Sequence, residues 1–416
     1  MEKIVLENGL RILLLRIAGA RSASVGVWVA AGSRHEEARQ QGISHFIEHM
    51  LFKGTSRRSA RAISEEMDML GGNVNAYTSR EYTRYYAQCL GENAVQALDI
   101  LCDMLTSSRL DREEMERERG VILDEMAMYE DSGEDVAHEA LCAAVWPGSP
   151  LGRTICGLPE TVRALTPDDL RGYMRRHYTP DRMVAVAAGE FDREGVLRLL
   201  RDTLGALRRG EGAPALDAPA FTPALALKAK EFEQTSLTLA MPGLPAGDER
   251  RYAMSLLNFI VGGGASSRLF QRLREELGLA YSVYSASYAS RGAGLFTVAA
   301  SFSGGQQEQV LSEILAVLRG LPGTITAEEF ARARAQVKAS FVLGLETVAA
   351  QASYAGRNEL LEGREVPAEE AVAALDRLTP AEVEDLACML LRDPRRALSV
   401  AGETRGAAFY EPFLQA

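Results

Sequence analysis

The chain has 416 residues, of which 47% are hydrophobic and 25% are charged, a composition typical of globular proteins. Its 46 basic and 57 acidic residues give a net charge of −11, which argues against nucleic acid or an anionic membrane surface as a general partner. No stretch approaches the roughly 20 apolar residues of a membrane-spanning helix, and the length predicts two or three domains.

The first 20 residues, MEKIVLENGLRILLLRIAGA, predict two strands joined by a tight turn. They are apolar but carry charges throughout, and the Asn-Gly pair is typical of a hairpin turn. A signal peptide would need an uninterrupted apolar stretch, so we expect a cytoplasmic protein.

Strands and amphipathic helices then follow one another through the first half. The segment ASVGVWVAAGS (23–33) alternates in polarity and ends on Gly-Ser, which predicts a strand. A pair of strands is predicted within 71–90, and one more strand near 183–190. Helices are predicted near 40–53, 58–70, 92–107 and 111–130.

A segment near the middle of the chain, residues 207–224, has the composition of a linker. It is rich in Gly, Pro and Ala and lacks hydrophobic periodicity. We therefore predict an N-terminal domain at 1–208, a linker at 209–222 and a C-terminal domain at 223–416.

The second half repeats the order of elements of the first. Residues 236–278 predict a strand, a loop, a helix, a run of glycines and a second helix, and residues 24–72 predict a strand, a loop and two helices in the same order. This internal duplication predicts an α+β fold of two homologous domains, each a mostly antiparallel sheet packed with helices. All five histidines precede residue 178, so only the first half can hold a histidine-based metal site.

The helix around HFIEHMLF gathers three chemically active side chains on one face. At 100° per residue, its core-facing stripe comprises Ile43, Phe46, Ile47, Met50 and Leu51. The opposite stripe comprises His45, Glu48, His49 and Phe52. Two histidines four positions apart can reach one cation, with Glu48 beside it. The alternative is a solvated face on which two histidines stand by chance.

A catalytic zinc site needs a third protein ligand and an open position. On the helix at 110–130, the predicted inward face comprises Glu118, Val121, Ile122, Glu125 and Tyr129, with Met115 nearby. Burying two carboxylates in an apolar stripe is costly unless a cation meets them. The alternative is that the helix rolls slightly and leaves both carboxylates solvated.

The motif His45-Phe46-Ile47-Glu48-His49 is an HxxEH sequence, and Glu125 follows His49 by 76 positions in ERERGVILDEM. Together with LENGLRIL, AGSRHE, GGNVNAYTSREYTRYY and the duplicated second half, it closely resembles the pitrilysin/insulinase-type metallopeptidases. Within these inverzincins, the chain is most similar to the shorter two-domain members related to the mitochondrial processing peptidase β subunit. The resemblance covers nearly the whole chain.

The resemblance implies roles for residues of the first half. It implies one Zn²⁺ per chain held by His45, His49 and Glu125. Glu48 would be the general base that deprotonates the attacking water, and Glu118 a carboxylate that supports the ligands.

The resemblance also implies substrate contacts in both halves. The strand containing Asn75, Ala76 and Tyr77 would bind the substrate as an added β-strand; the alternative is an ordinary strand with polar ends. In the second half, Tyr281 would hydrogen-bond the carbonyl oxygen of the scissile bond and Arg274 would hold that region. The alternative for Arg274 is a solvated position on its helix.

The function that the resemblance implies is that of a zinc-dependent endopeptidase. It would hydrolyse peptides or unfolded segments in a chamber formed by two chains, with a homodimer favoured over a heterodimer with a related chain. One alternative is a non-catalytic scaffold or partner subunit, and another is a zinc hydrolase acting on something other than peptides. Cleavage specificity does not follow from the sequence.

Overall fold

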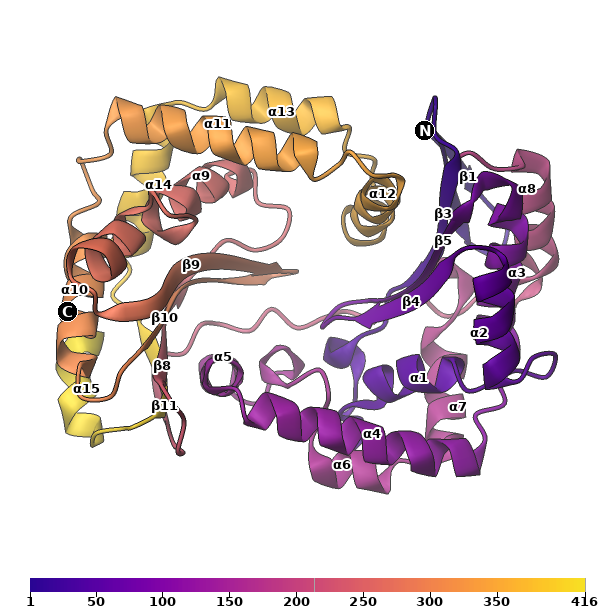
Figure 1. The fold of residues 1–416 in the computed structure, drawn as a ribbon, viewed down its shortest axis with the longest axis horizontal. Helices are drawn as coiled ribbons and strands as arrows, with labels where there is room; N and C mark the ends of the chain where they lie inside the picture. The colour runs from indigo at the N-terminus through magenta and orange to yellow at the C-terminus, as the bar shows by residue number, and fades with distance from the viewer. Residues whose placement is uncertain (213, 416) are drawn as a thin grey trace. The chain divides into compact units, whose positions relative to one another are not determined.

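The computed structural model describes residues 1–212 and 214–415, which form two compact units (Figure 1). The first unit comprises Met1–Met126, Thr154–Ala215 and Leu343–Val366. The second unit comprises Ala127–Arg153, Leu216–Val342 and Pro367–Ala416. Each unit is built around one β-sheet.

The sheet of the first unit has six strands in the order β1-β2-β6-β3-β5-β4. The strands are β1 (Glu2–Val5), β2 (Arg11–Arg16), β3 (Ser22–Val29), β4 (Asn73–Thr78), β5 (Thr83–Leu90) and β6 (Met183–Gly189). Only the β2–β6 pair is parallel. Strand β4 is an edge strand, and its backbone is paired on one side, with β5.

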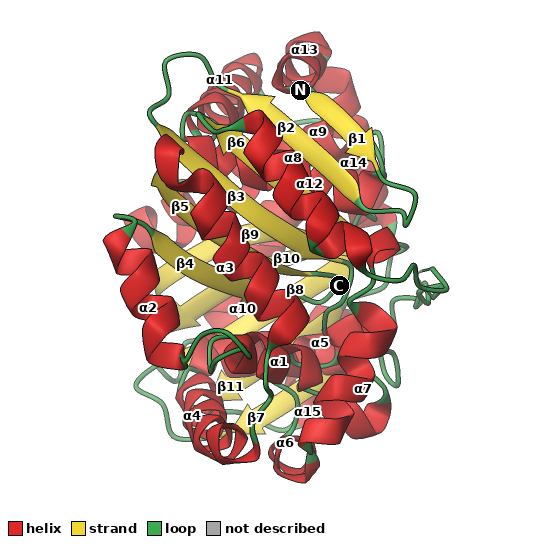
Figure 2. Ribbon diagram, turned by 90° about the vertical axis from the view of Figure 1, so that its right-hand side faces the viewer, coloured by secondary structure: helices red, strands yellow, loops and turns green. Residues whose placement is uncertain are grey.

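Helices cover the first sheet. They are α1 (Ile43–Leu51), α2 (Ala60–Met69), α3 (Ala94–Ser107), α4 (Arg112–Glu130, whose last residues belong to the second unit), α6 (Pro159–Ala164), α7 (Pro167–His177), α8 (Arg193–Asp202) and α12 (Val348–Glu362). Short 3-10 turns lie at Ser33–His35, Ala38–Gln40, Gly91–Asn93, Pro180–Arg182 and Leu204–Ala206. Figure 2 shows α3 and α8 lying across the strands.

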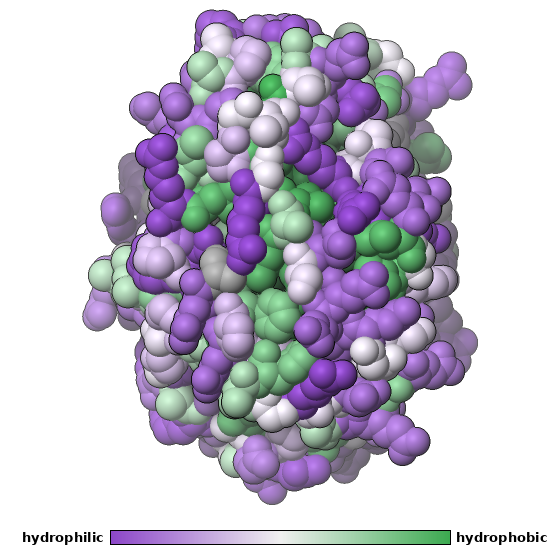
Figure 3. Space-filling model, turned by 90° about the vertical axis from the view of Figure 1, so that its left-hand side faces the viewer, coloured by the Kyte–Doolittle hydropathy of each residue, from purple (hydrophilic) through white to green (hydrophobic). Residues whose placement is uncertain are grey.

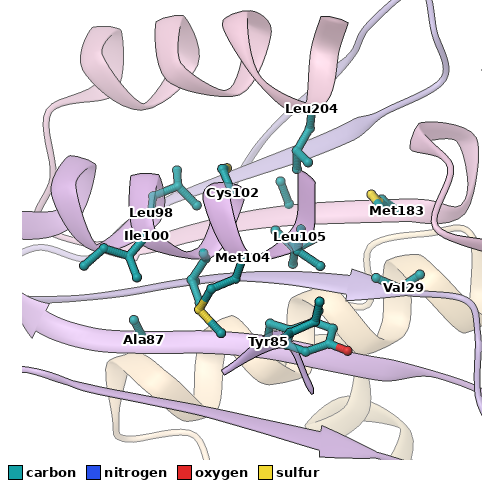
Figure 4. Packing of buried hydrophobic residues seen from close by; sticks show 14 of the residues in the cluster. Val29, Tyr85, Ala87, Leu98, Ile100, Cys102, Met104, Leu105, Met183 and Leu204 are labelled. Atoms are coloured by element: carbon teal, nitrogen blue, oxygen red, sulfur yellow. The ribbon is translucent and has the colours of Figure 1, made fainter. Parts of the chain in front are cut away.

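The core of the first unit lies between α3 and the sheet. Figure 4 shows side chains of α3, among them Ile100 and Met104, directed toward Tyr85 and Ala87 of β5. Strand β6 is buried along its whole length, whereas β5 alternates between buried and more exposed residues. A strand covered on both faces needs apolar residues throughout, and one covered on one face needs them at every second position.

The sheet of the second unit has five strands in the order β7-β11-β8-β10-β9. The strands are β7 (Ala224–Ala229), β8 (Thr235–Pro242), β9 (Ala280–Ser290), β10 (Ala293–Phe302) and β11 (Ala397–Gly402). The helices are α5 (Gly133–Val145), α9 (Arg251–Gly262), the π-helix Phe270–Glu276, α10 (Gln307–Arg319), α11 (Ala327–Leu343), α13 (Ala368–Arg377), α14 (Pro380–Arg392) and α15 (Ala407–Leu414). A 3-10 turn lies at Pro150–Gly152.

The two sheets share one topology, which confirms the predicted α+β fold with an internal duplication. The order β2-β6-β3-β5-β4 corresponds to β7-β11-β8-β10-β9, and each sheet contains one parallel pair, at β2–β6 and at β7–β11. Strand β9 therefore corresponds to β4, and both are edge strands.

Each half of the chain contributes one helix to the other compact unit. Helix α12, from the second half, packs on β6, β3 and β2, while α5, from the first half, packs on β11, β7 and β8. The contiguous ranges 1–208 and 223–416 are therefore not the compact units. The predicted linker at 209–222 includes residue 213, which lies outside the described residues.

Close packing and a buried ion pair hold α12 on the first sheet. A Cβ added at Gly356 would lie 2.7 Å from the buried ring of Trp28, so helix and strand approach closely at this point. The buried carboxylate of Glu359 meets Lys3 Nζ at 2.7 Å and Arg11 Nη1 at 3.5 Å. These charges compensate the burial of the acid.

No helix within residues 1–212 and 214–415 is long and apolar enough to cross a membrane. The face of the molecule seen in Figure 3 carries mostly hydrophilic residues, with hydrophobic residues in smaller patches between them.

Candidate metal centre

Helix α1 presents the HxxEH residues, and its start is fixed by a carboxylate from the preceding loop. Glu36 is buried and accepts hydrogen bonds from Gly42 N (2.8 Å) and Ser44 N (2.9 Å). The first N–H groups of a helix have no partner within it, and a negative charge there is favourable. Gly42 itself has φ +90°, a conformation that favours glycine.

The core-facing stripe predicted for α1 is confirmed. Its members, Ile43, Phe46, Ile47, Met50 and Leu51, are all buried. Helix α1 packs beside β4, and Figure 1 shows α4 on its other side. The stripe therefore fixes the rotation of α1 and leaves His45, Glu48 and His49 on one side.

Three side chains that the sequence predicts as ligands converge in the first unit. One ligand atom from each of His45, His49 and Glu125 can be chosen so that all lie within 4.8 Å of one another. Glu125 Oε2 lies 3.6 Å from His45 Nε2 and 3.6 Å from His49 Nε2. The two imidazole rings meet edge to face with 4.6 Å between their centroids.

This donor set fits a zinc ion. Ligand distances of about 2 Å in a tetrahedral site place neighbouring ligand atoms roughly 3.4 Å apart. The two observed separations of 3.6 Å are close to this value. Two imidazole nitrogens and one carboxylate oxygen are a ligand set that zinc accepts, and three protein ligands leave a position open.

Burial and neighbouring charges act differently on the two histidines. Burial, assisted by His49 and opposed by Glu125, lowers the pKa of His45 to about 4. Burial also acts to lower the pKa of His49, but Glu125 and Glu118 outweigh it and raise this pKa above its usual value. A neutral His45 has a lone pair available for a metal.

Glu118 and Lys53 support one of the two histidines. Glu118 Oε2 lies 3.1 Å from His49 Nδ1, and Lys53 Nζ lies 2.6 Å from Glu118 Oε1. A carboxylate that accepts from Nδ1–H leaves the Nε2 lone pair directed at the metal position. His45 lacks this support, because its buried Nδ1 has no hydrogen-bond partner among the described residues.

The predicted inward face of α4 is only partly correct. Met115, Glu118 and Ile122 are buried, but Val121 is 50% and Tyr129 48% exposed. The buried stripe is thus narrower than the five-residue face drawn from the sequence. Glu118 lies within this buried stripe. The side chain of Glu125, beside the two histidines, is 30% exposed.

The general base candidate, Glu48, contacts the edge strand. Thr78 Oγ1 at the end of β4 donates a hydrogen bond to Glu48 Oε2. Burial raises the pKa of Glu48, although the Thr78 hydrogen bond and His49 act in the opposite direction. A carboxylate with a raised pKa holds a proton more firmly, as a general base at neutral pH requires.

The residues predicted to bind substrate, Asn75, Ala76 and Tyr77, lie on β4 next to this carboxylate. Asn75 is opposite Tyr86 of β5 and Tyr77 is opposite Arg84. Ala76 N–H donates to Asn75 Oδ1 at 2.8 Å, so it is directed away from β5 and toward the open edge. Because backbone direction alternates along a strand, Val74 and Thr78 also turn their backbone groups to this edge.

The two remaining candidates, Arg274 and Tyr281, belong to the second unit. Arg274 Nη1 donates to Tyr281 O at 2.5 Å, and its guanidinium carbon lies 5.6 Å from the centroid of the Tyr281 ring. Gly278, between them, has φ +59° and follows the π-helix Phe270–Glu276. The Tyr281 side chain is 70% exposed.

Three supporting residues were not singled out in the sequence. Lys53 follows His49 by four positions, so the helix periodicity offered a signal for it. Thr78 was recognised only as part of the strand, and Glu36 acts from an irregular loop, where no periodicity indicates its role.

Comparison with known proteins identifies the family. Residues 11–158 match Insulinase (Peptidase family M16), and residues 164–337 match Peptidase M16 inactive domain. The chain is 39% identical over 396 residues to the uncharacterized zinc protease YmxG of Bacillus subtilis, covering 94% of this chain and 96% of that protein. The chain belongs to peptidase family M16. The resemblance seen in the HxxEH sequence is therefore confirmed.

Other M16 proteins extend this comparison. An uncharacterized zinc protease of Streptomyces coelicolor is 39% identical over 415 residues, which cover 97% of this chain and 89% of that protein. A solved protease from Helicobacter pylori has a TM-score of 0.90 at 21% identity, covering 97% of this chain and 99% of that one. A solved M16 inactive domain protein from Pseudomonas fluorescens has a TM-score of 0.89 at 20% identity, covering 97% and 98%. These structures share the fold.

Four of the five histidines lie within the first M16 match, and His177 lies within the second. The match described as an inactive domain begins at residue 164, and the HxxEH sequence and Glu125 lie within the first match. The histidine ligands of an M16 site in this chain are therefore confined to the first half.

Proposed function

We propose that this chain is a zinc-dependent endopeptidase. The observation that carries the proposal is the convergence of His45, His49 and Glu125, with 3.6 Å between Glu125 Oε2 and each histidine Nε2, beside the buried carboxylate of Glu48. The relatives named zinc proteases support the same class of reaction.

The chain's own residues divide the chemical work. Zinc, when bound by the three ligands, supplies Lewis acidity that polarises a carbonyl and makes water more acidic. Glu48 takes a proton from the attacking water and passes it to the leaving amine. Thr78 holds one oxygen of Glu48, so the carboxylate keeps its orientation between β4 and the metal ligands.

The open edge of β4 recognises the substrate backbone. An extended peptide that adds to this edge pairs with the outward backbone groups of Val74, Ala76 and Thr78, and backbone pairing accepts many side chains. The strand ends at Thr78, which contacts Glu48, so a peptide in this position passes the general base. Peptides and unfolded segments can adopt this extended conformation, whereas most backbone groups of a folded domain are already paired.

The assembly and the second half belong to the same proposal. We expect two chains to enclose the substrate as a homodimer in the cytoplasm, with Tyr281 stabilising the oxyanion and Arg274 holding Tyr281 through its backbone carbonyl. Sedimentation equilibrium tests the dimer, and a monomeric active protein would contradict it. A Tyr281→Phe variant with full activity would contradict the role of Tyr281.

A Glu48→Gln variant tests the proposed reaction. With zinc bound, the wild-type chain should cleave members of a library of unstructured peptides, detected by mass spectrometry. The variant should keep its zinc and lose at least about 100-fold in kcat, because removal of a general base costs roughly 10²–10⁴-fold. Glu113→Gln, at an exposed position on α4, is the matched control and should retain activity.

Two outcomes would contradict the proposal. Full activity in the zinc-loaded Glu48→Gln variant would exclude Glu48 as the base. A zinc-loaded wild-type chain that cleaves no peptide would favour a non-catalytic scaffold or a hydrolase for other substrates.

A further inference from the structure

The two faces of β4 differ in chemistry. Val74, Ala76 and Thr78 lie on the face that packs toward α1 and the core. Asn73, Asn75 and Tyr77 are exposed on the other face, where Tyr77 stands opposite Arg84 of β5. A peptide added to the edge of β4 would also present alternate side chains to these two faces.

Helix α12 covers only part of this second face. It packs on β6, β3 and β2, and its Ser353 Oγ accepts a hydrogen bond from Arg84 Nη1. Arg84 and Tyr86 on β5 are half-buried, and Tyr77 on β4 is 47% exposed. The part of the face next to the open edge of β4 is therefore accessible.

Two arginines and three tyrosines lie on this second face. The guanidinium carbon of Arg84 lies 4.6 Å from the centroid of the Tyr86 ring and 5.6 Å from that of Tyr77. Tyr77 and Tyr82 have ring centroids 6.3 Å apart. Burial raises the pKa of Tyr82, and the charge of Arg357 on α12 acts in the opposite direction. We call Tyr77, Tyr82, Arg84 and Arg357 the basic-aromatic patch.

The positive charge of this patch is not neutralised within the part of the chain that the structure describes. Neither Arg84 nor Arg357 lies within 4 Å of a carboxylate there, in contrast to the buried Arg34 and the half-buried Arg58 of the same unit, which form such pairs. Arg84 is held in place by the Ser353 hydrogen bond and by the aromatic rings. A fixed, half-buried cation without a carboxylate partner is a site for an anionic group.

We propose that the basic-aromatic patch is a substrate subsite that selects acidic side chains in the bound peptide. The inference rests on the proposed function, because it needs a peptide paired with β4. Neighbouring strands lie about 4.8 Å apart, so the peptide residue beside Tyr77 stands about two strand spacings from the Cα of Arg84. A glutamate at that position reaches across the Tyr77 ring to the guanidinium, and an aspartate reaches less far.

The selection should follow the alternation of the peptide. Side chains on the patch face are favoured when acidic and disfavoured when basic. Side chains on the other face meet Val74, Ala76 and the metal ligands, so the patch does not act on them. The acidic preference should also weaken with added salt, because part of the patch is exposed to solvent.

Matched peptides measure this preference. A peptide that the zinc-loaded chain cleaves is synthesised with Glu, Gln or Lys at each position in turn, and kcat/KM is measured. We expect a Glu-over-Gln preference of about tenfold at alternate positions, as for a charge-assisted hydrogen bond, and a lower value for Lys. Arg84→Met should bring the Glu-to-Gln ratio of kcat/KM close to one, and Arg84→Lys should retain part of the preference for Glu.

Two further variants separate the subsite from an effect on folding. Arg357→Met changes an exposed residue and should reduce the same preference by a smaller factor. Arg61→Met, at an exposed position of α2 away from the patch, should leave the preference unchanged. An unchanged Glu preference in both patch variants would overturn the proposal, as would equal kcat/KM for Glu, Gln and Lys peptides.

Binding to the Glu48→Gln variant keeps the test independent of catalysis. Fluorescence anisotropy with labelled Glu and Gln peptides should show the same tenfold preference and its loss in the Arg84→Met background. If the wild-type chain cleaves nothing but this binding preference is present, the proposed reaction fails and the subsite stands. If peptides are cleaved without the preference, or none of them binds, the subsite fails.

Discussion

At the scale of single residues, the chain Lys53–Glu118–His49 determines how one ligand faces the metal position. Lys53 Nζ and Glu118 Oε1 are 2.6 Å apart, and the second oxygen of the same carboxylate meets His49 Nδ1 at 3.1 Å. The partners of ligating histidines orient the ring and fix the tautomer. Lys53 therefore positions a ligand without contacting the metal position.

Replacing Lys53 should weaken zinc binding. We expect Lys53→Met to raise the zinc dissociation constant about tenfold, the lower end of the effect of changing such partners, because Glu118 loses its cation. Lys53→Arg should retain most of the affinity, and Lys228→Met, an exposed lysine of the second unit, is the control. Competition with a chromophoric chelator measures the constant, and an unchanged value in Lys53→Met would refute the role.

A second buried histidine, His177, should make stability depend on pH. Its ring stacks on Tyr173 with 4.2 Å between the centroids, and its Nδ1 accepts from Arg182 Nη1 at 2.8 Å. Burial and then Arg182 lower the pKa of His177 from 6.5 to about 4. Between these values the unfolded chain binds more protons than the folded one, so stability falls as the pH falls.

Urea unfolding of wild type and His177→Gln at pH 7.5 and pH 5 tests this dependence. The wild type should lose about 2 kcal/mol more stability than the variant over this range, since each pKa unit corresponds to about 1.4 kcal/mol. Glutamine can still accept from Arg182, so the variant should fold. Equal losses in the two proteins would show that His177 does not titrate as described.

At the scale of elements, the compact units differ from the two halves of the sequence, because α12 belongs to the first unit and α5 to the second. Gly356 of α12 allows the helix to approach Trp28, whose ring would stand 2.7 Å from an added Cβ. Interiors packed this closely do not accept an extra methyl group without a shift. The packing of the first sheet therefore includes a helix from the second half of the sequence.

A matched pair of glycine substitutions tests the packing of α12. Gly356→Ala should destabilise the protein by about 1–3 kcal/mol and lower its melting temperature, because of the contact with Trp28. Gly120→Ala, in exposed α4 with no atom within 4 Å of the added Cβ, should be neutral or stabilising by up to about 1 kcal/mol. Equal melting temperatures for the two variants would contradict the close approach.

Local periodicity predicted most elements that carry the candidate site. The core stripe of α1, the β4–β5 pair and the position of α4 follow from residue spacing, because one face of each element meets the core. The residue spacing wrongly placed Val121 and Tyr129 on the buried face of α4. Helical periodicity gives the direction of each side chain around the helix axis, but not how wide a strip of the helix is buried. The exchange of α5 and α12 was not predicted, because an amphipathic helix does not indicate which sheet it covers.

At the scale of the whole molecule, the three predicted zinc ligands all lie in one of two units that share a topology. Both units have an edge strand, β4 or β9, but His45, His49 and Glu125 belong to the first unit. The contacts of the supporting residues emerged only from the structure: Thr78 and Lys53 meet Glu48 and Glu118 from distant parts of the sequence, and Glu36 acts from an irregular loop that no periodicity indicates.

The most direct test of this account is a zinc titration of the metal-free chain, followed by cleavage of an unstructured peptide. We expect no cleavage without metal and a linear rise in activity that ends at one zinc per chain. The Glu125→Gln variant should need a higher zinc concentration, because one of the three ligands is lost. Cleavage by the metal-free chain, or a rise with no break at one equivalent, would contradict the central claim.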